Sequence, residues 1–272
     1  MNFDYIYGNP PYEGKLHLDI LSVIKDKANT IVWLHPARWA QSLTSPKELR
    51  HLNGRIKNFD LIRENTKELF CGMDISGDLI ISTFIRNGGK SMSDLNPLAL
   101  RCVFPNPDLM LGIYNKVMSK TEHFVNEKLV TDRLIDNAVV VSLIGGNGGQ
   151  GNSKISKLVT SNQDCVYVNG VAEDGRTFIE RRSKGSPAKD IIDHVRFPTY
   201  VEAKNFLESM KTPFYICINS ISKCDMHVHP DRLPLMKDYT EPWTHERFCN
   251  FYGLTKEEKE EIEKVVADPN NY

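Results

Sequence analysis

The tetrapeptide Asn9-Pro10-Pro11-Tyr12 carries the clearest chemistry in the sequence. Two consecutive prolines restrict the backbone, so the Asn9 side-chain oxygen and the Pro10 carbonyl oxygen can be held as two adjacent hydrogen-bond acceptors. Such a pair can bind both hydrogens of an exocyclic amine, while the Tyr12 ring stacks on the base that carries the amine. The plainer interpretation is a proline turn in which Asn9 and Tyr12 are incidental.

The segments around this tetrapeptide alternate in the manner of an α/β protein. Residues 3–9 have the pattern of a buried strand that ends at the tetrapeptide. Ligands of open α/β sheets bind outside the carboxyl ends of strands, so the position suits a site. The alternation predicts a mostly parallel sheet with helices on its faces. Strands are expected at 3–9, 30–36, 59–65 and 74–89, and helices at 16–28 and 45–56.

The character of the chain changes near residue 90, where prolines become frequent. This shift predicts a boundary that divides the chain into regions 1–90, 91–240 and a helical tail at 241–272. Thr255 and Glu258 have the spacing of a capping box at the start of the last helix. In the later regions helices are expected at 109–118, 201–211 and 253–267, strands at 139–144 and 214–221, and a hairpin over 165–182 that turns around 173–175.

The composition excludes several classes of protein. The 272 residues include 34 Lys and Arg against 35 Asp and Glu, a balance that fits neither a nucleic-acid coat protein nor an acidic DNA mimic. No apolar run reaches the length of a membrane span, and the first residues do not form a secretory signal. Six cysteines without paired spacing then favour reduced thiols in a cytoplasmic protein. A metal site at Cys224, His227 and His229 is the weaker alternative, because a second ligand pair at zinc spacing is absent.

Several motifs together resemble the adenine-N6 DNA methyltransferases of the NPPY family. Besides residues 9–12, the segments TIVWLHPARWAQS (30–42) and ELFCGMDISGDLIISTFIRNGG (68–89) are similar to later conserved segments of that family. The stretches 196–223 and 233–266 look like the C-terminal half of an Eco57I-type restriction–modification methylase. One position departs from that pattern, since His245 replaces an acidic residue after Trp243-Thr244.

The resemblance implies a fold and a mechanism. The expected fold is α/β, a partial Rossmann-like methyltransferase sheet from the NPPY strand onward, followed by an α+β target-recognition-like region over 91–240. Asn9, Pro10, Pro11 and Tyr12 would hold a base flipped out of double-stranded DNA, with Tyr12 and Phe70 stacking on its two faces. Methyl transfer from S-adenosylmethionine would then depend mainly on positioning. Adenine rather than cytosine N4 as the target rests on the resemblance alone.

The cofactor motif of this family is not found where it is expected. Its glycine-rich turn lies well upstream of NPPY, and only eight residues precede Asn9. Residues 146–151 satisfy the spacing GxGxxG, but a long helix and a later acidic residue do not follow. Three interpretations of this loop remain: a permuted cofactor site, a loop that approaches DNA, or a plain flexible loop.

The absence of an upstream half would leave residues 3–9 at an exposed apolar sheet edge. We therefore expect a cover: a complementing subunit, a second copy, or later segments of the chain itself. Basic residues that could track DNA phosphates lie within 37–51 and 176–189 and in the glycine-rich loop, although scattered solvated charge is the commoner explanation. The candidates are Arg38, Lys154, Arg181, Arg182 and Lys184.

Two functions follow as hypotheses from these patterns. The first is a site-specific adenine-N6 methyltransferase-like protein that needs a partner or an N-terminal half to bind S-adenosylmethionine. The second is a non-catalytic DNA-binding or interaction protein, such as a decoy or modulator of a restriction–modification system. Whether the chain is active alone, split or degenerate stays open from the sequence.

Overall fold

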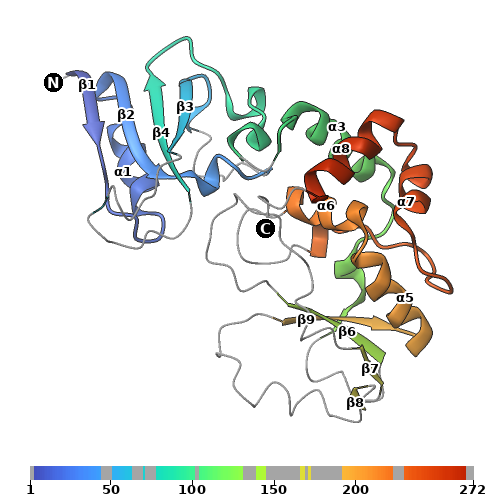
Figure 1. Ribbon diagram of the computed structural model, residues 1–272. Coiled ribbons are helices and arrows are strands. Elements are labelled where there is room, and N and C mark those ends of the chain that lie inside the picture. The colour runs from blue at the N-terminus through green and yellow to red at the C-terminus, as the bar shows by residue number, and fades with distance from the viewer. Residues whose placement is uncertain are drawn as a thin grey trace. The chain divides into compact units, whose positions relative to one another are not determined.

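The computed structural model describes residues 3–43, 51–62, 70, 78–101, 104–130, 139–144, 166–168, 171–172, 192–222 and 230–267. These residues fall into two compact units that divide between Pro107 and Asp108 (Figure 1). This division rests on compactness alone, so the functional regions expected at 1–90, 91–240 and 241–272 stay a prediction.

The first unit contains a four-stranded mixed sheet in the order β1-β2-β4-β3. The helix α1 joins β1 to β2, and these two strands pair parallel; β4 pairs antiparallel with both β2 and β3. The strands β1, β2 and β3 therefore run in one direction and β4 runs in the opposite one, so the sheet expected to be mostly parallel is mixed. The bounds are β1 Phe3–Gly8, α1 Leu16–Ile24, β2 Ala28–Pro36, β3 Ile56–Ile62 and β4 Leu79–Ile85.

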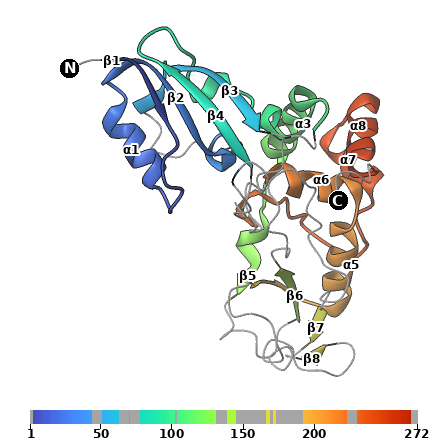
Figure 2. The ribbon, with the colours of Figure 1, turned by 60° about the vertical axis from the view of Figure 1, so that its left-hand side comes forward.

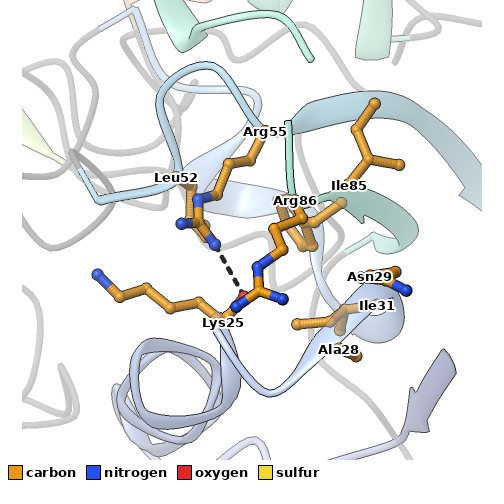
Figure 3. A pocket seen from close by; sticks show the side chains of 9 residues that line it. Lys25, Ala28, Asn29, Ile31, Leu52, Arg55, Ile85 and Arg86 are labelled. Atoms are coloured by element: carbon orange, nitrogen blue, oxygen red, sulfur yellow. Dashed lines mark hydrogen bonds between the residues drawn. The ribbon is translucent and has the colours of Figure 1, made fainter. Parts of the chain in front are cut away.

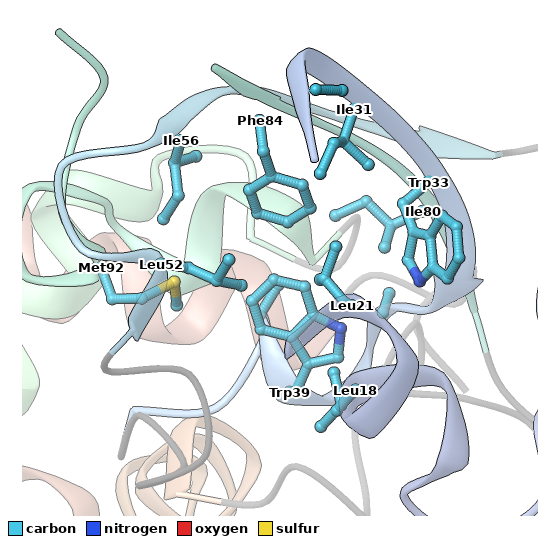
Figure 4. Close-up of a cluster of buried hydrophobic side chains, with 13 residues drawn as sticks. Leu18, Leu21, Ile31, Trp33, Trp39, Leu52, Ile56, Ile80, Phe84 and Met92 are labelled. Atoms are coloured by element: carbon cyan, nitrogen blue, oxygen red, sulfur yellow. The ribbon is translucent and has the colours of Figure 1, made fainter. Parts of the chain in front are cut away.

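The helix α1 lies along one face of this sheet, as Figures 1 and 2 show. Leu18 and Leu21 from α1 are buried against alternate residues of β2 and β4 (Figure 4). The alternation follows from the period of two in a strand, which sends every second side chain to the same face. The packing of α1 against this apolar face of the sheet fixes the carboxyl ends of β1 and β2 relative to the helix. Its buried residues include Ile31, Trp33, Trp39, Ile80 and Phe84.

The strand β1 forms where it was expected, but it is exposed rather than buried. It lies at the edge of the sheet, and Phe3, Tyr5 and Tyr7 are exposed. A strand that is paired on one side only keeps part of its surface in solvent, whatever the apolarity of its sequence. The prediction of a buried strand at 3–9 is therefore wrong.

The helix expected at 45–56 falls mostly outside the described residues. Its predicted end is wrong, because Gly54 has a positive φ of 74° and β3 already begins at Ile56. Glycine adopts such a left-handed conformation without the steric cost of a side chain. Short 3₁₀ helices complete the described chain at Ala37–Trp39, Met92–Asp94, Pro97–Leu100, Val125–Lys128 and Pro230–Arg232.

The second unit combines helices with a five-stranded sheet in the order β5-β9-β6-β7-β8. The strand expected at 139–144 and the helices expected at 109–118 and 201–211 are confirmed as β6, α3 and α5. The helices are α3 Pro107–Lys120, α5 Tyr200–Met210, α6 Pro213–Ser222, α7 His245–Tyr252 and α8 Lys256–Ala267. The strands are β5 Leu129–Val130, β6 Val139–Ile144, β7 Val166–Val168, β8 Val171–Ala172 and β9 Ile192–Phe197.

The capping box predicted for the last helix is confirmed at α8. The Thr255 N–H donates to a Glu258 carboxylate oxygen at 2.7 Å, and the Glu258 N–H donates to the Thr255 hydroxyl at 3.3 Å. Lys116 of α3 donates to both oxygens of the same carboxylate at 2.7 Å. The cap therefore also ties α8 to α3.

Two expectations for the second unit are wrong. Residues 214–221 form the helix α6 rather than a strand, with Phe214, Ile218 and Ile221 all buried. A helix that is buried on all sides shows no polar face, so its apolar run cannot be distinguished from a buried strand by periodicity. The pairing of Val168 in β7 with Val171 in β8 interrupts the first strand of the hairpin expected over 165–182, and residues 173–175, where its turn was expected, lie outside the described residues.

Three further observations concern the part of the chain that the structure describes. None of its helices is long and apolar enough to cross a membrane. Its residues include no cluster of three side chains suited to hold a metal ion. Cys217 and Cys249 are both buried, and neither belongs to a disulfide.

Candidate functional site

The Asn9–Tyr12 turn follows β1 directly, at the carboxyl end of that strand. Asn9 and Pro11 are exposed, Pro10 is buried and Tyr12 is half-buried. The Tyr12 hydroxyl donates a hydrogen bond to the Asn9 side-chain oxygen at 2.7 Å. The structure therefore brings together the two side chains to which the sequence assigns chemistry.

This hydrogen bond leaves acceptor capacity on Asn9. An amide oxygen has two lone pairs, and Tyr12 occupies one of them, so the other can accept from an external N–H group. Burial raises the pKa of Tyr12 to about 12, so its hydroxyl remains a protonated donor at neutral pH. The Pro10 carbonyl as a second acceptor stays a prediction.

The turn starts from a close contact between Gly8 and Trp33. These residues are register partners in β1 and β2, and a Cβ on Gly8 would lie 1.8 Å from a Trp33 ring carbon. The Trp33 ring is itself held in place, because its indole N–H donates to the His17 carbonyl oxygen at 3.2 Å. Only glycine fits at position 8, and the turn therefore begins from a fixed support.

A buried polar network lies on the same face of β2 as Trp33. The Trp39 indole N–H donates to His35 Nδ1 at 2.9 Å, and His35 Nε2 lies 2.7 Å from the Ser82 hydroxyl. An indole nitrogen can only donate, so Nδ1 of His35 is the acceptor and its proton resides on Nε2. Burial, with a smaller contribution from His17, lowers the pKa of His35 to about 3. His35 is thus a neutral residue that positions its neighbours.

His17 extends this network towards the first turn of α1. Its ring lies 5.7 Å from that of His35, and burial lowers its pKa. Its Nδ1 is buried without a hydrogen-bond partner among the described residues. His17, His35 and Trp39 are not among the residues to which the sequence patterns assigned a role. The alternation of β2 contains a signal for His35, which shares the buried face with Ile31 and Trp33.

The structure does not unite the remaining predicted residues with this turn. Arg38 is exposed in the short 3₁₀ helix that follows β2. Phe70 is half-buried in a turn, and its role on the second face of a base stays a prediction. The other residues and segments to which the sequence assigned a role lie outside the described residues: Lys154, Arg181, Arg182, Lys184, the loop 146–151 and the group Cys224, His227 and His229.

A second arrangement, Cys249 with His245 and Glu263, has the residue types of a nucleophilic triad. Cys249 Sγ lies 3.6 Å from His245 Nε2, which lies 3.3 Å from a Glu263 oxygen. However, His245 Nδ1 accepts the Phe214 N–H at 3.1 Å, so the proton of the ring is on Nε2. No ring nitrogen is left to take the thiol proton, and burial raises the pKa of Cys249 to about 11.

This arrangement is therefore structural. His245 accepts from one of the backbone N–H groups that the first turn of α6 leaves unpaired.

A small cavity lies where α1 ends and β2 begins (Figure 3). Its free volume is about 10 Å³, which is room for a single water. Lys25, Arg55 and Arg86 line it, and Arg55 donates to an Asp26 oxygen at 2.7 Å. The hydrogen bond from Arg55 is the main cause of the lowered pKa of Asp26.

This cavity does not fit S-adenosylmethionine. A nucleoside is far larger than one water, and three cations repel a sulfonium. The cavity also lies at the opposite end of β2 from the Asn9–Tyr12 turn, because β1 and β2 run parallel and Gly8 pairs with Trp33 near the carboxyl end.

Neither the family models nor the curated proteins searched contain a match to this chain. What the structure defines is an α/β protein with a mixed sheet and an Asn-Pro-Pro-Tyr turn at the carboxyl end of a strand. The chemistry of that turn is the basis for assigning a function.

Proposed function

We propose that this chain binds double-stranded DNA and holds a flipped adenine at the Asn9–Tyr12 turn, in the manner of adenine-N6 DNA methyltransferases. In this proposal the first unit is a partial Rossmann-like methyltransferase sheet, and a target-recognition-like region follows it. The observation that carries the proposal is the hydrogen bond of 2.7 Å between the Tyr12 hydroxyl and the Asn9 side-chain oxygen, at the carboxyl end of β1.

The residues of the turn have complementary tasks. Asn9 accepts one hydrogen of the exocyclic amine and the Pro10 carbonyl accepts the other, which directs the amine lone pair towards the methyl group to be transferred. The Tyr12 ring stacks on the base, an interaction worth about 1–3 kcal/mol. These contacts offset the few kcal/mol that unstacking a base costs.

The support beneath the turn explains why these contacts can be specific. Gly8 rests on the Trp33 ring, and the Trp33 indole is hydrogen-bonded to the His17 backbone. His35 and Trp39 hold each other on the same face of β2. Catalysis by positioning depends on such a rigid support, because small displacements of the reacting atoms cost large factors in rate.

S-adenosylmethionine would supply the methyl group. The small cavity lined by Lys25, Arg55 and Arg86 does not fit this cofactor, and we propose that a complementing subunit binds it. The chain would act on DNA in the cytoplasm as part of a restriction–modification system.

The base-holding step can be tested without knowledge of the recognised sequence. Flipping an adenine leaves its thymine partner unpaired, and permanganate oxidises unpaired thymines. Plasmid DNA incubated with the protein and then treated with permanganate should show discrete reactive thymines. Asn9→Ala should remove them, whereas Asn87→Ala, another exposed asparagine of the first unit, should not.

Two outcomes would contradict the proposal. The first is protection of DNA without reactive thymines, and the second is an unchanged pattern for Asn9→Ala.

A non-catalytic DNA-binding or modulating protein is the second candidate. The observation that favours it is the basic cavity, too small for the cofactor, in the unit that carries the turn. Calorimetry with S-adenosylmethionine, on this chain alone and together with the product of the neighbouring gene, separates the two. Cofactor binding in either experiment supports the methyltransferase; DNA binding without cofactor binding in both supports the alternative.

A further inference from the structure

The exposed apolar side chains of the described residues gather on β1 and α1. Seven large hydrophobic residues are exposed, and five of them belong to these two neighbouring elements of the first unit. The five are Phe3, Tyr5, Tyr7, Leu16 and Val23, whereas Val201 and Phe251 belong to the second unit. Clusters of exposed apolar side chains of this kind mark interaction surfaces.

The aromatic residues of β1 form a row along one face of the strand. Phe3, Tyr5 and Tyr7 are exposed by 50, 60 and 72 %, and the rings of Tyr5 and Tyr7 stack with centroids 6.1 Å apart. Because successive side chains of a strand alternate, this row lies on the face opposite to Ile6, which packs against the core. The row is continuous along the strand and open to solvent.

Among the described strands, only β2 pairs with β1, and it does so along one edge. The Phe3 N–H donates to the Lys27 carbonyl oxygen at 2.8 Å, so the odd-numbered N–H groups of β1 point towards β2. The groups of Asp4, Ile6 and Gly8 therefore point away from the sheet, since backbone groups alternate in direction along a strand. β1 is the terminal strand of the sheet order.

The strand at the opposite edge of the same sheet, β3, differs from β1 because it carries features that prevent pairing with another chain. β3 exposes Lys57, Asn58 and Asp60 along its length, and its register shifts between Ile56 and Asn58. Charged side chains and irregular register are the usual devices that prevent strands from pairing with another chain. β1 has a regular register with β2, and its only charged residue is Asp4.

We propose that β1 pairs antiparallel with β1 of a second copy of this chain, across a two-fold axis that passes beside Tyr5. In this register Tyr5 lies opposite Tyr5 of the second copy, and Phe3 lies opposite Tyr7. Each exposed aromatic ring then has an aromatic cross-strand neighbour, a favourable pairing in antiparallel sheets. The outward groups of Asp4 and Ile6 become the hydrogen-bonded positions.

The two-fold arrangement also determines where the α1 helices of the two copies lie. Leu16 and Val23 are seven residues apart and therefore lie on one side of that helix. An axis perpendicular to the sheet places the α1 helices of both copies on the same face, so both exposed pairs lie on one side of the new interface. A single extended peptide would engage the strand edge alone.

The oligomeric state of the whole chain tests the proposal. Light scattering coupled to size exclusion should give the mass of a dimer for the wild type. Tyr5→Lys should give a monomer, because it places like charges opposite each other on the axis. Asp60→Lys, which changes the protected edge strand, should stay dimeric. A monomeric wild type, or dimers for Tyr5→Lys, would overturn the inference.

Cysteine cross-linking tests the register. Residues opposite each other at a non-hydrogen-bonded position have Cα atoms about 4.5 Å apart, within the range of a disulfide. Tyr5→Cys should therefore form a covalent dimer under mild oxidation, above the level of the wild type with its native cysteines. Tyr7→Cys should not, since it faces Phe3. The reverse result would contradict the proposed axis.

This inference rests on the strand edge and not on the proposed function. A monomer whose Asn9→Ala variant loses the reactive thymines would remove the dimer and leave the base-holding proposal standing.

Discussion

The Trp39 indole N–H donates to Nδ1 of His35 at 2.9 Å, and this contact determines the protonation state of the buried imidazole. With Nδ1 committed as an acceptor, the Nε2 proton is directed to Ser82, and a second ring proton has no place. The network beneath the Asn9–Tyr12 turn therefore depends on a neutral histidine.

This protonation state predicts how the stability of the first unit depends on pH. The pKa of His35 is about 3 in the folded protein and 6.5 when unfolded, so between these values only the unfolded state binds the proton. The free energy of unfolding should then decrease as the pH falls below about 6.5, at a limiting slope of about 1.4 kcal/mol per pH unit. Urea unfolding at pH 7 and pH 5 measures this decrease in the free energy of unfolding. A stability that rises on acidification would contradict the assignment.

Two substitutions of Tyr12 distinguish the contribution of its ring, by stacking, from that of its hydroxyl, by hydrogen bonding. Tyr12→Phe retains the ring and releases the Asn9 oxygen, so it should leave DNA binding within about threefold of the wild type. Tyr12→Ala removes the ring, and we expect a loss of about 5- to 150-fold, the equivalent of one stacked base. The protein concentration that half-saturates the permanganate pattern measures both. Equal losses would show that the hydroxyl, not the ring, carries the effect.

Gly8 offers a stability test with a matched control. Gly8→Ala would drive a methyl group into the Trp33 ring, so we expect a loss of about 1–3 kcal/mol in the first unit. Gly112→Ala, in the exposed interior of α3, meets no atom within 4 Å and should stabilise its own unit by up to about 1 kcal/mol. Calorimetry of both variants measures the two effects. A neutral Gly8→Ala would mean that the Trp33 ring can move aside.

The reactivity of the Cys249 thiol tests the conclusion that this residue is not a nucleophile. Because it is buried and its pKa is raised to about 11, iodoacetamide at pH 7.5 should not label it in the folded protein. Labelling should appear once urea unfolds the second unit, and peptide mass spectrometry assigns it to this residue. Rapid native labelling would reopen a catalytic role for the arrangement with His245.

The role of His245 depends on a contact that is distant in the sequence. The sequence shows that a histidine follows Trp243-Thr244. The role of its ring depends on Phe214, 31 residues away, whose N–H it accepts. A contact across that separation requires the packing of α7 against α6 and cannot be seen in local patterns.

Local chemistry alone determined several elements of this protein. The capping box of Thr255 and Glu258 and the end of β1 at the Asn9–Tyr12 turn were predictable, because each depends on groups within a few residues of one another. The amphipathic pattern likewise predicted α1 and β2.

Only the tertiary structure decided the remaining features. The antiparallel entry of β4 and the helical state of α6 depend on which segments pair over long separations. The neutral His35 depends on Trp39 and on Ser82, which lies on another strand. An apolar residue pattern indicates that a segment is more stable when buried. Whether the segment is buried depends on the elements that pack against it in the fold.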